Sequence, residues 1–177
     1  IKNSAISTYN DSISQLLLYC KNIWVSNPDS IKNIIRELKP GDTLYVDSGQ
    51  ITVDFALNQL GDASQPIVIA GSPNMKTIFT GNNSSISSCS NIHLKNIIFS
   101  NRSGKNIVIQ DSSANIKFFN CQFLNSKQNG LEINHKSLVY LENCIISNNQ
   151  GHGINCINRE TKLIVKNVLI SQNQQNG

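Results

Sequence analysis

The sequence predicts an all-β protein, a single-stranded parallel β-helix with three sheets, 23–24 residues per coil and an N-terminal capping helix. One short segment that closes with asparagine recurs at intervals of 24, 23 and 24 residues, in 91–96, 115–120, 138–143 and 162–167. Apolar residues alternate along each repeat, which is the period of a half-buried strand. Because one coil cannot bury its inner face alone, the repeats must stack to form a common core.

The capping helix is predicted to begin directly after Asn27. This asparagine is a good N-cap, Pro28 suits the first helical position, and Asp29 places an acid in the first turn. Apolar residues then follow at helical spacing until Pro40 and Gly41 end the helix. Such a helix would cover the open end of the solenoid. We therefore expect residues 1–41 to form an N-terminal segment with this cap, and residues 42–177 to form a β-helix truncated at its C-terminal end.

Two further elements are expected in the first part of the chain. Residues 10–20 are predicted to include a short helix, and Ile23–Val25 a strand, from their apolar spacing. Residues 55–65 are interpreted as a corner that is longer than the others, a place where solenoids often build binding surfaces.

The repeats themselves give three strands per coil with like residues above one another. The predicted inward rows are Ile92, Ile116, Val139 and Leu163; Leu94, Phe118, Leu141 and Val165; Ile97, Cys121, Cys144 and Val168; Phe99, Phe123, Ile146 and Ile170; Ile107, Leu131 and Ile154; and Ile109, Ile133 and Cys156. The recurring asparagines are expected at tight left-handed corners, where stacked amides can bond from coil to coil. This structural ladder is Asn96, Asn120, Asn143 and Asn167.

This repeat resembles the right-handed parallel β-helix repeats of the pectin-lyase-like superfamily over about residues 39–177. Residues 38–46, 65–70 and 76–79 also resemble the start of the first coil in polysaccharide lyases of the chondroitinase and alginate-lyase type. The resemblance implies the fold and its starting register. It does not fix the activity, since one fold carries many chemistries.

Composition argues against several classes of function. The net charge of +4 is mild, and few aromatic residues lie among the lysines, so nucleic acid is not an expected partner. No run of 18 apolar residues is present, so no membrane span is expected. The five cysteines lack metal-site spacing and are expected to be buried, Cys156 among them, with a disulfide between Cys121 and Cys144 left open.

Outward positions of the third sheet are the candidate binding residues, because the resemblance implies that this sheet contacts sugars. The set is Glu132, Asn134, His135, His152, Asn155 and Arg159. Within it, Gly151-His152-Gly153 is similar to a polygalacturonase motif whose catalytic aspartates lie one coil earlier. Here Gln128 and Asn129 stand there and cannot ionise, so we expect no catalytic residue. The two glycines are interpreted as turn residues.

A second outward row is unusually apolar for a solvated surface. Its members are Ile98, Gln122, Ile145 and Leu169. The row indicates a protein interface or a covering segment, and ordinary β-propensity on an exposed sheet explains it equally well.

Together these observations favour a non-catalytic module, a secreted or cell-surface scaffold of adhesin type that binds a polysaccharide or a protein partner. The alternative is the N-terminal portion of a lyase acting on a uronic-acid-containing polysaccharide, with its catalytic coils beyond residue 177. No cofactor or metal is expected, and calcium only if the lyase alternative holds, because no acids stack on adjacent coils. Further coils or a capping partner are expected at the C-terminal end.

Overall fold

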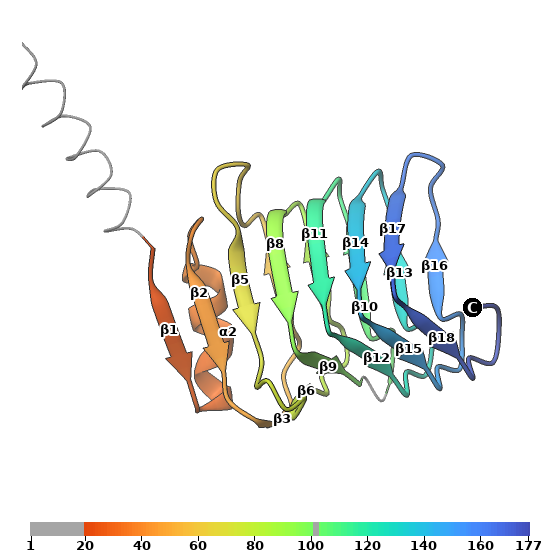
Figure 1. Ribbon diagram of the computed structural model, residues 1–177, viewed down its shortest axis with the longest axis horizontal. Helices are drawn as coiled ribbons and strands as arrows, with labels where there is room; N and C mark the ends of the chain where they lie inside the picture. Colours follow the sequence, from red (N-terminus) through yellow and green to blue (C-terminus); the bar gives the residue numbers. More distant parts are fainter. Residues whose placement is uncertain (1–19, 101–102) are drawn as a thin grey trace, which may run out of the picture.

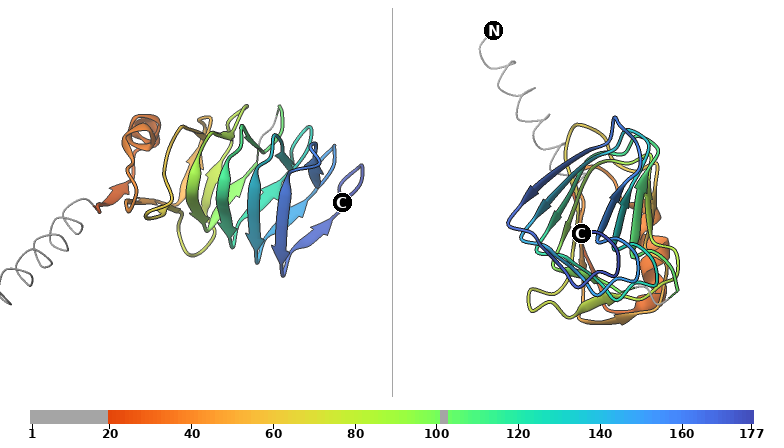
Figure 2. Two further views of the ribbon diagram at one scale, coloured as in Figure 1. Left: turned by 90° about the horizontal axis from the view of Figure 1, so that it is seen from above. Right: turned by 90° about the vertical axis from the view of Figure 1, so that its right-hand side faces the viewer.

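The protein is a parallel β-solenoid in a computed structural model that describes residues 20–100 and 103–177 (Figure 1). The strands wind around one interior, and the coils superimpose when the solenoid is viewed along its length (Figure 2, right). The fold class predicted from the repeats is therefore confirmed. The short helix expected in residues 10–20 falls almost wholly outside the described residues.

Three parallel sheets, here called A, B and C, run along the solenoid. Sheet A contains β1 (Asn22–Val25), β2 (Thr43–Val46), β5 (Ile67–Ala70), β8 (Ser90–Lys95), β11 (Ala114–Phe119), β14 (Leu138–Glu142) and β17 (Lys162–Lys166). Sheet B contains β3 (Gly49–Ile51), β6 (Thr77–Phe79), β9 (Ile97–Phe99), β12 (Gln122–Leu124), β15 (Ile145–Ser147) and β18 (Leu169–Ser171). Sheet C, the third sheet of the sequence prediction, contains β4 (Ala56–Asn58), β7 (Ser85–Ser87), β10 (Ile107–Gln110), β13 (Leu131–Ile133) and β16 (Ile154–Cys156).

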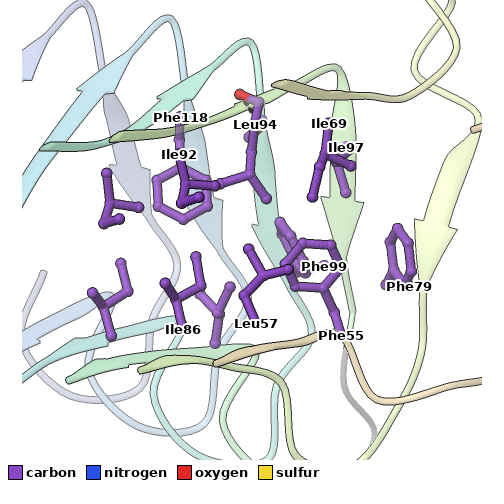
Figure 3. Packing of buried hydrophobic residues seen from close by; sticks show 14 of the residues in the cluster. Phe55, Leu57, Ile69, Phe79, Ile86, Ile92, Leu94, Ile97, Phe99 and Phe118 are labelled. Atoms are coloured by element: carbon purple, nitrogen blue, oxygen red, sulfur yellow. Dashed lines mark hydrogen bonds between the residues drawn. The ribbon is translucent and has the colours of Figure 1, made fainter. Parts of the chain in front are cut away.

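The strand register places like residues above one another, as the repeat predicted. Phe118 pairs with Leu94 and Leu141 in sheet A, and Phe123 pairs with Phe99 and Ile146 in sheet B. These side chains are buried in a continuous core (Figure 3). The rings of Phe99 and Phe123 stack at 5.5 Å, so the core is a column of rings as well as of aliphatic side chains.

The capping helix α2 (Pro28–Glu37) forms where the sequence predicted it. The side chain of Asn27 accepts a hydrogen bond from the backbone N–H of Asp29 at 3.0 Å, which caps the first turn. Ile31 and Ile35 are buried, and the helix contacts β4 and β1. The strand expected at Ile23–Val25 is β1, which extends sheet A by pairing with β2. The division at residues 41 and 42 stays a prediction.

Four successive coils, starting with the one that contains β8 and β9, have a left-handed corner formed by asparagine. Asn96, Asn120, Asn143 and Asn167 all have φ between 52° and 56°. The side-chain amide of Asn120 donates to Asn96 Oδ1 at 2.8 Å, and that of Asn167 donates to Asn143 Oδ1 at 2.7 Å. A second set of corners, after the sheet B strands, contains Asn125, Asn148 and Gln172, with φ between 56° and 58°.

Three expectations need correction. Residues 55–65 are not only a corner, since they contain β4, and Phe55 and Leu57 are fully buried. Three residues predicted to be inward, Cys156, Val165 and Ile170, lie in register with buried partners but are exposed, because β16, β17 and β18 are the last strands of their sheets. Cys20, which was expected to be buried, is also exposed. The disulfide between Cys121 and Cys144, which the sequence left open, is not formed, and none of the five cysteines belongs to a disulfide.

Candidate ligand groove over sheet C

The outer face of sheet C carries an open groove of about 480 Å³. Amide and hydroxyl side chains form most of its lining, together with one carboxylate and one ammonium group. The lining residues are Asn82, Asn83, Ser84, Ser85, Ser103, Gly104, Lys105, Val108, Gln110, Gln128, Glu132 and Asn134. They come from β7, β10 and β13, from the segments that lead into these strands and, for Asn134, from the residue directly after β13. We call this surface the sheet C groove.

Glu132 is the central charged residue of the groove and is only 4% exposed. It points outward because it follows the inward Leu131 in β13, and its row neighbours are Val108 and Asn155, as predicted. Lys105 Nζ donates to Glu132 Oε1 at 2.6 Å, and the amide of Asn129 donates to Oε2 at 2.9 Å. The carboxylate is therefore held from two sides.

Hydrogen bonding decides the protonation state of Glu132. Burial alone would raise its pKa, but the bonds from Lys105, Asn134 and Asn129 outweigh burial and lower the pKa below its usual value. Glu132 is thus an anion at neutral pH. It is a weak base, because a carboxylate of low pKa binds a proton poorly.

Asn134 adds a hydrogen-bonding site that the protein leaves unused. Its amide nitrogen donates to Glu132 Oε1 at 3.2 Å, whereas its Oδ1 is buried and accepts no hydrogen bond within the described part of the chain. A buried acceptor without a donor is costly, so a ligand hydroxyl that donates to it would be favoured. The groove can therefore bind a hydroxyl-rich ligand. The ion pair of Lys105 and Glu132 adds no net charge to it.

The structure brings only part of the predicted binding set together. Glu132 and Asn134 line the groove. His135 turns to the exposed Asp111, with Nδ1 3.2 Å from Oδ1, and Arg159 lies in an exposed turn after β16. His152 and Asn155 are half-buried beside the groove but do not line it.

Gly151 and Gly153 are required by close packing around the backbone. Neither has a positive φ, so neither is required for a left-handed turn. A Cβ atom on Gly153 would lie 2.7 Å from Asn173 Nδ2, and one on Gly151 would lie 2.5 Å from Asn129 Oδ1. Both glycines lie in bends of the connection between β15 and β16, as expected of turn residues. Glycine is needed there because neighbouring side chains pack closely against the backbone, and not for a left-handed φ.

Lys105, which lines the groove, and Asn129, which does not line it, are the two partners of the Glu132 carboxylate that the sequence did not indicate. Both stand two positions before the first residue of a sheet C strand, in successive coils, with His152 two positions before β16 in the next. Aligning the repeats through this segment would have placed the three in one column beside Glu132. The contact itself crosses 27 residues and depends on side-chain conformation, which the alignment does not give.

The outward row of sheet B lies where it was predicted. In register, Gln122 pairs with Ile98 on one side and with Ile145 on the other, and Ile145 pairs with Leu169. Ile78 pairs with Ile98 and extends the row by one strand. Leu169 is 57% exposed and the other three predicted members are half-buried. The role of this row as an interface stays a prediction.

Within residues 20–100 and 103–177, no three His, Cys, Asp or Glu side chains gather in a way that could hold a metal ion. Over the same residues, no helix has the length and apolar character needed to cross a membrane.

The stacked coils, the asparagine corners and the open groove over one sheet define a parallel β-helix repeat protein. Residues 67–177 match the family model described as right handed beta helix region, and the chain belongs to this family. The right hand of the coils, expected from the resemblance, follows from this membership.

Comparisons with individual proteins add less. No curated protein matches the chain. Among solved structures, the chain is similar to the crystal structure of pectate lyase Pel9A, with 11% sequence identity and a TM-score of 0.36. The match covers 84% of this chain and 63% of that one, so the chain spans less than two thirds of that protein's length.

Proposed function

We propose that this chain is a non-catalytic β-helix module, a surface or extracellular scaffold that binds glycan through the sheet C groove. The observation that carries the proposal is the ion pair between Lys105 and Glu132, with 2.6 Å between Nζ and Oε1. Among the described residues that line the groove, these are the one cation and the one anion. Each neutralises the other, and the remaining lining is polar and uncharged.

The lining suits neutral or weakly charged sugars. Sugar hydroxyls both donate and accept hydrogen bonds, and the amides of Asn82, Asn83, Gln110 and Gln128 do the same. The buried Oδ1 of Asn134 gives such a ligand one acceptor that is not already used. Specific sites of this kind combine a shaped cleft with a few well-placed polar groups.

The lyase alternative has less support from this groove. Removing the proton beside a uronate carboxylate requires a base, and neutralising that carboxylate requires a cation. Glu132 is a weak base because its pKa is lowered, and Lys105 already neutralises Glu132. Calcium stays tied to the lyase alternative, and further coils, a capping partner and a protein partner stay predictions.

Binding to neutral oligosaccharides tests the proposal. Isothermal titration against a panel of glucan, mannan and xylan oligomers is expected to find a ligand for the intact chain. The Asn134→Ala variant should bind it about five- to tenfold more weakly, since one hydrogen bond to a buried acceptor is lost. Asn155→Ala removes an equal amide one strand away, outside the groove, and should change affinity less than about twofold.

Two results would contradict the proposal. If Asn155→Ala weakens binding as much as Asn134→Ala, the groove is not the contact surface. If the intact chain steadily releases unsaturated products from polyuronides, followed by ultraviolet absorbance, the module is catalytic and the lyase alternative is correct.

The ion pair of Lys105 and Glu132 leads us to expect that the stability of the fold depends on pH. Because the folded protein lowers the pKa of Glu132, the ionised carboxylate stabilises the fold above the unfolded pKa of about 4.3. This stability is lost as the pH falls through the lowered folded value. Glu132→Gln should therefore melt below the wild type at neutral pH, and the gap in Tm should narrow in acid. A gap that stays constant from neutral pH into acid would show that Glu132 is not ionised in the folded protein.

A further inference from the structure

The outer face of sheet A differs from the sheet C groove in a way that indicates a second site. Trp24, Tyr45, Phe119 and Tyr140 project from it, and the other aromatic residues in the described part of the chain are buried phenylalanines. These outward aromatic residues come from β1, β2, β11 and β14, which lie in one sheet with β5 and β8 across the front of Figure 1. Exposed rings gathered on one face of a solenoid form a binding surface more often than scattered ones do. We call this face the sheet A strip.

The strip has two parts. At its N-terminal end, the rings of Trp24 and Tyr45 are nearly parallel, 5.0 Å apart, and 68% and 38% exposed. Farther along, a groove of about 460 Å³ is lined mainly by apolar atoms, with Phe119, 42% exposed, and Tyr140 on adjacent strands. Trp24 and Phe119 are four strands apart in the same outward row, roughly 19 Å at the usual strand spacing.

Cations lie among these rings. Lys95 pairs in register with Phe119, and Lys117 pairs with Tyr140, with its Nζ 5.4 Å from the centre of the Tyr140 ring. Neither lysine belongs to an ion pair within the described residues. The one carboxylate that lines this groove, Glu142, is bound by Lys166 at 2.7 Å. The strip therefore attracts anions, unlike the sheet C groove.

His93 lies between the two lysines and adds a polar atom without a partner. Its Nε2 is buried and makes no hydrogen bond within the described part of the chain. Burial, and then the charges of Lys117 and Lys95, lower its pKa, so the ring is neutral at neutral pH. On the other neighbouring strand, β5, Val68 is the register partner and carries no charge. A bound anion would counter both lysines and favour protonation of His93.

We propose that the sheet A strip binds an anionic glycan, with sugar rings on the aromatic side chains and carboxylate or sulfate groups at Lys95 and Lys117. The flat C–H face of a sugar ring is electropositive and complements the negative face of an aromatic ring. Trp24, Tyr45, Lys95 and Phe119 lie in one outward row along the solenoid, which suits an extended chain of sugar units. This site is separate from the sheet C groove and does not depend on it.

Other macromolecules fit the strip less well. Single-stranded nucleic acid also stacks on aromatic rings, but it carries a phosphate at every nucleotide and needs a groove dense in cations. Two unpaired lysines and a neutral histidine do not provide that density. A protein partner would find Lys95 and Lys117 in the middle of the surface, whereas protein interfaces keep charged residues, lysine above all, away from their centres.

Trp24 provides a direct readout, because it is the one tryptophan of the chain and it lies on the strip. Titration with a long galacturonate oligomer, or with chondroitin sulfate, is expected to change its emission. The two ligands distinguish carboxylate from sulfate as the preferred anion. The methyl-esterified galacturonate oligomer should bind about tenfold more weakly, and binding should strengthen as the pH falls toward the ordinary pKa of histidine, about 6.5.

Variants locate the site. Lys95→Ala with Lys117→Ala should weaken binding about tenfold or more, and Phe119→Ser about fivefold, judged by titration calorimetry. Lys32→Ala, which removes one positive charge from α2, and Asn134→Ala in the sheet C groove should leave the emission response unchanged. Circular dichroism melting of each variant checks that the fold is kept.

Four results would overturn the proposal. They are no emission change with either anionic glycan, equal affinity for the esterified oligomer, unchanged affinity in the double lysine variant, or tighter binding to an oligothymidylate of similar length. A loss of binding in Asn134→Ala alone would assign the anionic glycan to the sheet C groove instead. Failure of neutral glycans to bind would count against the proposed function without affecting the strip.

Discussion

Two of the asparagine columns in this solenoid lie at different corners, and they stabilise it in different ways. At the corners between sheets A and B, Asn96 and Asn120 are half-buried, adopt positive φ, and are joined by an amide hydrogen bond. Between sheets B and C, Asn149 and Asn106 are fully buried and bonded to one another and to the backbone. The asparagines of the first column adopt the left-handed conformation that the backbone turn requires. Those of the second column form hydrogen bonds with backbone groups beside the turn.

We call the column between sheets B and C the inner column, and the one between sheets A and B the outer column. In the inner column, the side chain of Asn149 is fully hydrogen-bonded. Its amide nitrogen donates to Phe123 O at 3.1 Å and to Asn173 Oδ1 at 2.8 Å. Its Oδ1 accepts from the backbone N–H of Ser126 at 3.0 Å and from Asn106 Nδ2 at 3.1 Å. All four hydrogen-bonding positions of the amide are therefore used in the dry interior. Residue type alone therefore does not determine what an asparagine does in a coil.

The largest effect is expected from breaking the inner column. Asn149→Ala leaves buried groups of Phe123, Ser126, Asn106 and Asn173 without this partner, and should destabilise the fold by about 3 kcal/mol or more. For a chain of this size that corresponds to a fall in Tm of roughly 6–12 °C, measured by circular dichroism. The matched control is Asn148→Ala, which changes the adjacent, exposed asparagine at φ 58°. If the two variants melt alike, the inner column has no special role.

A smaller effect is expected at the outer column. Asn120→Ala places a residue with no side-chain amide at φ 52° and removes the bond to Asn96. Alanine in the left-handed region costs about 1 kcal/mol, and the loss of the half-buried amide bond adds a fraction of that. The expected loss is about 1–2 kcal/mol, well under that of Asn149→Ala. Equal losses at both columns would contradict the distinction drawn between them.

The sequence predicted the interior well because burial imposes a strict period on it. Alternation placed Phe99 above Phe123 and Leu94 above Phe118, since a one-residue shift would turn every such side chain outward. It failed at β4 and β7, where a single apolar residue, Leu57 or Ile86, lies between small or polar neighbours. With one inward residue per strand there is no period to detect.

The candidate sites were predicted only in part. Alternation placed Glu132 and Asn134 on the third sheet, but not the contact of Glu132 with Lys105, which depends on how a flexible side chain crosses to the next coil. The inner column was missed because Asn148 and Asn149 are adjacent residues of the same type, and the sequence does not indicate which of them is exposed and which is buried. The sheet A strip was missed because its rings are far apart in the sequence and only the stacked coils bring them together.

The smallest effect is expected from glycine at the outer column, and it separates the two contributions made by Asn120. Asn120→Gly keeps the left-handed corner at no steric cost but still loses the amide bond to Asn96. We expect a loss of about 0.5–1 kcal/mol, part of it from the greater freedom of glycine in the unfolded chain. If Asn120→Gly and Asn120→Ala melt at the same temperature, the amide bond and not the backbone conformation dominates. If glycine is as stable as the wild type, the corner asparagine is selected for its φ angle alone, and only the buried column acts as a hydrogen-bonding ladder.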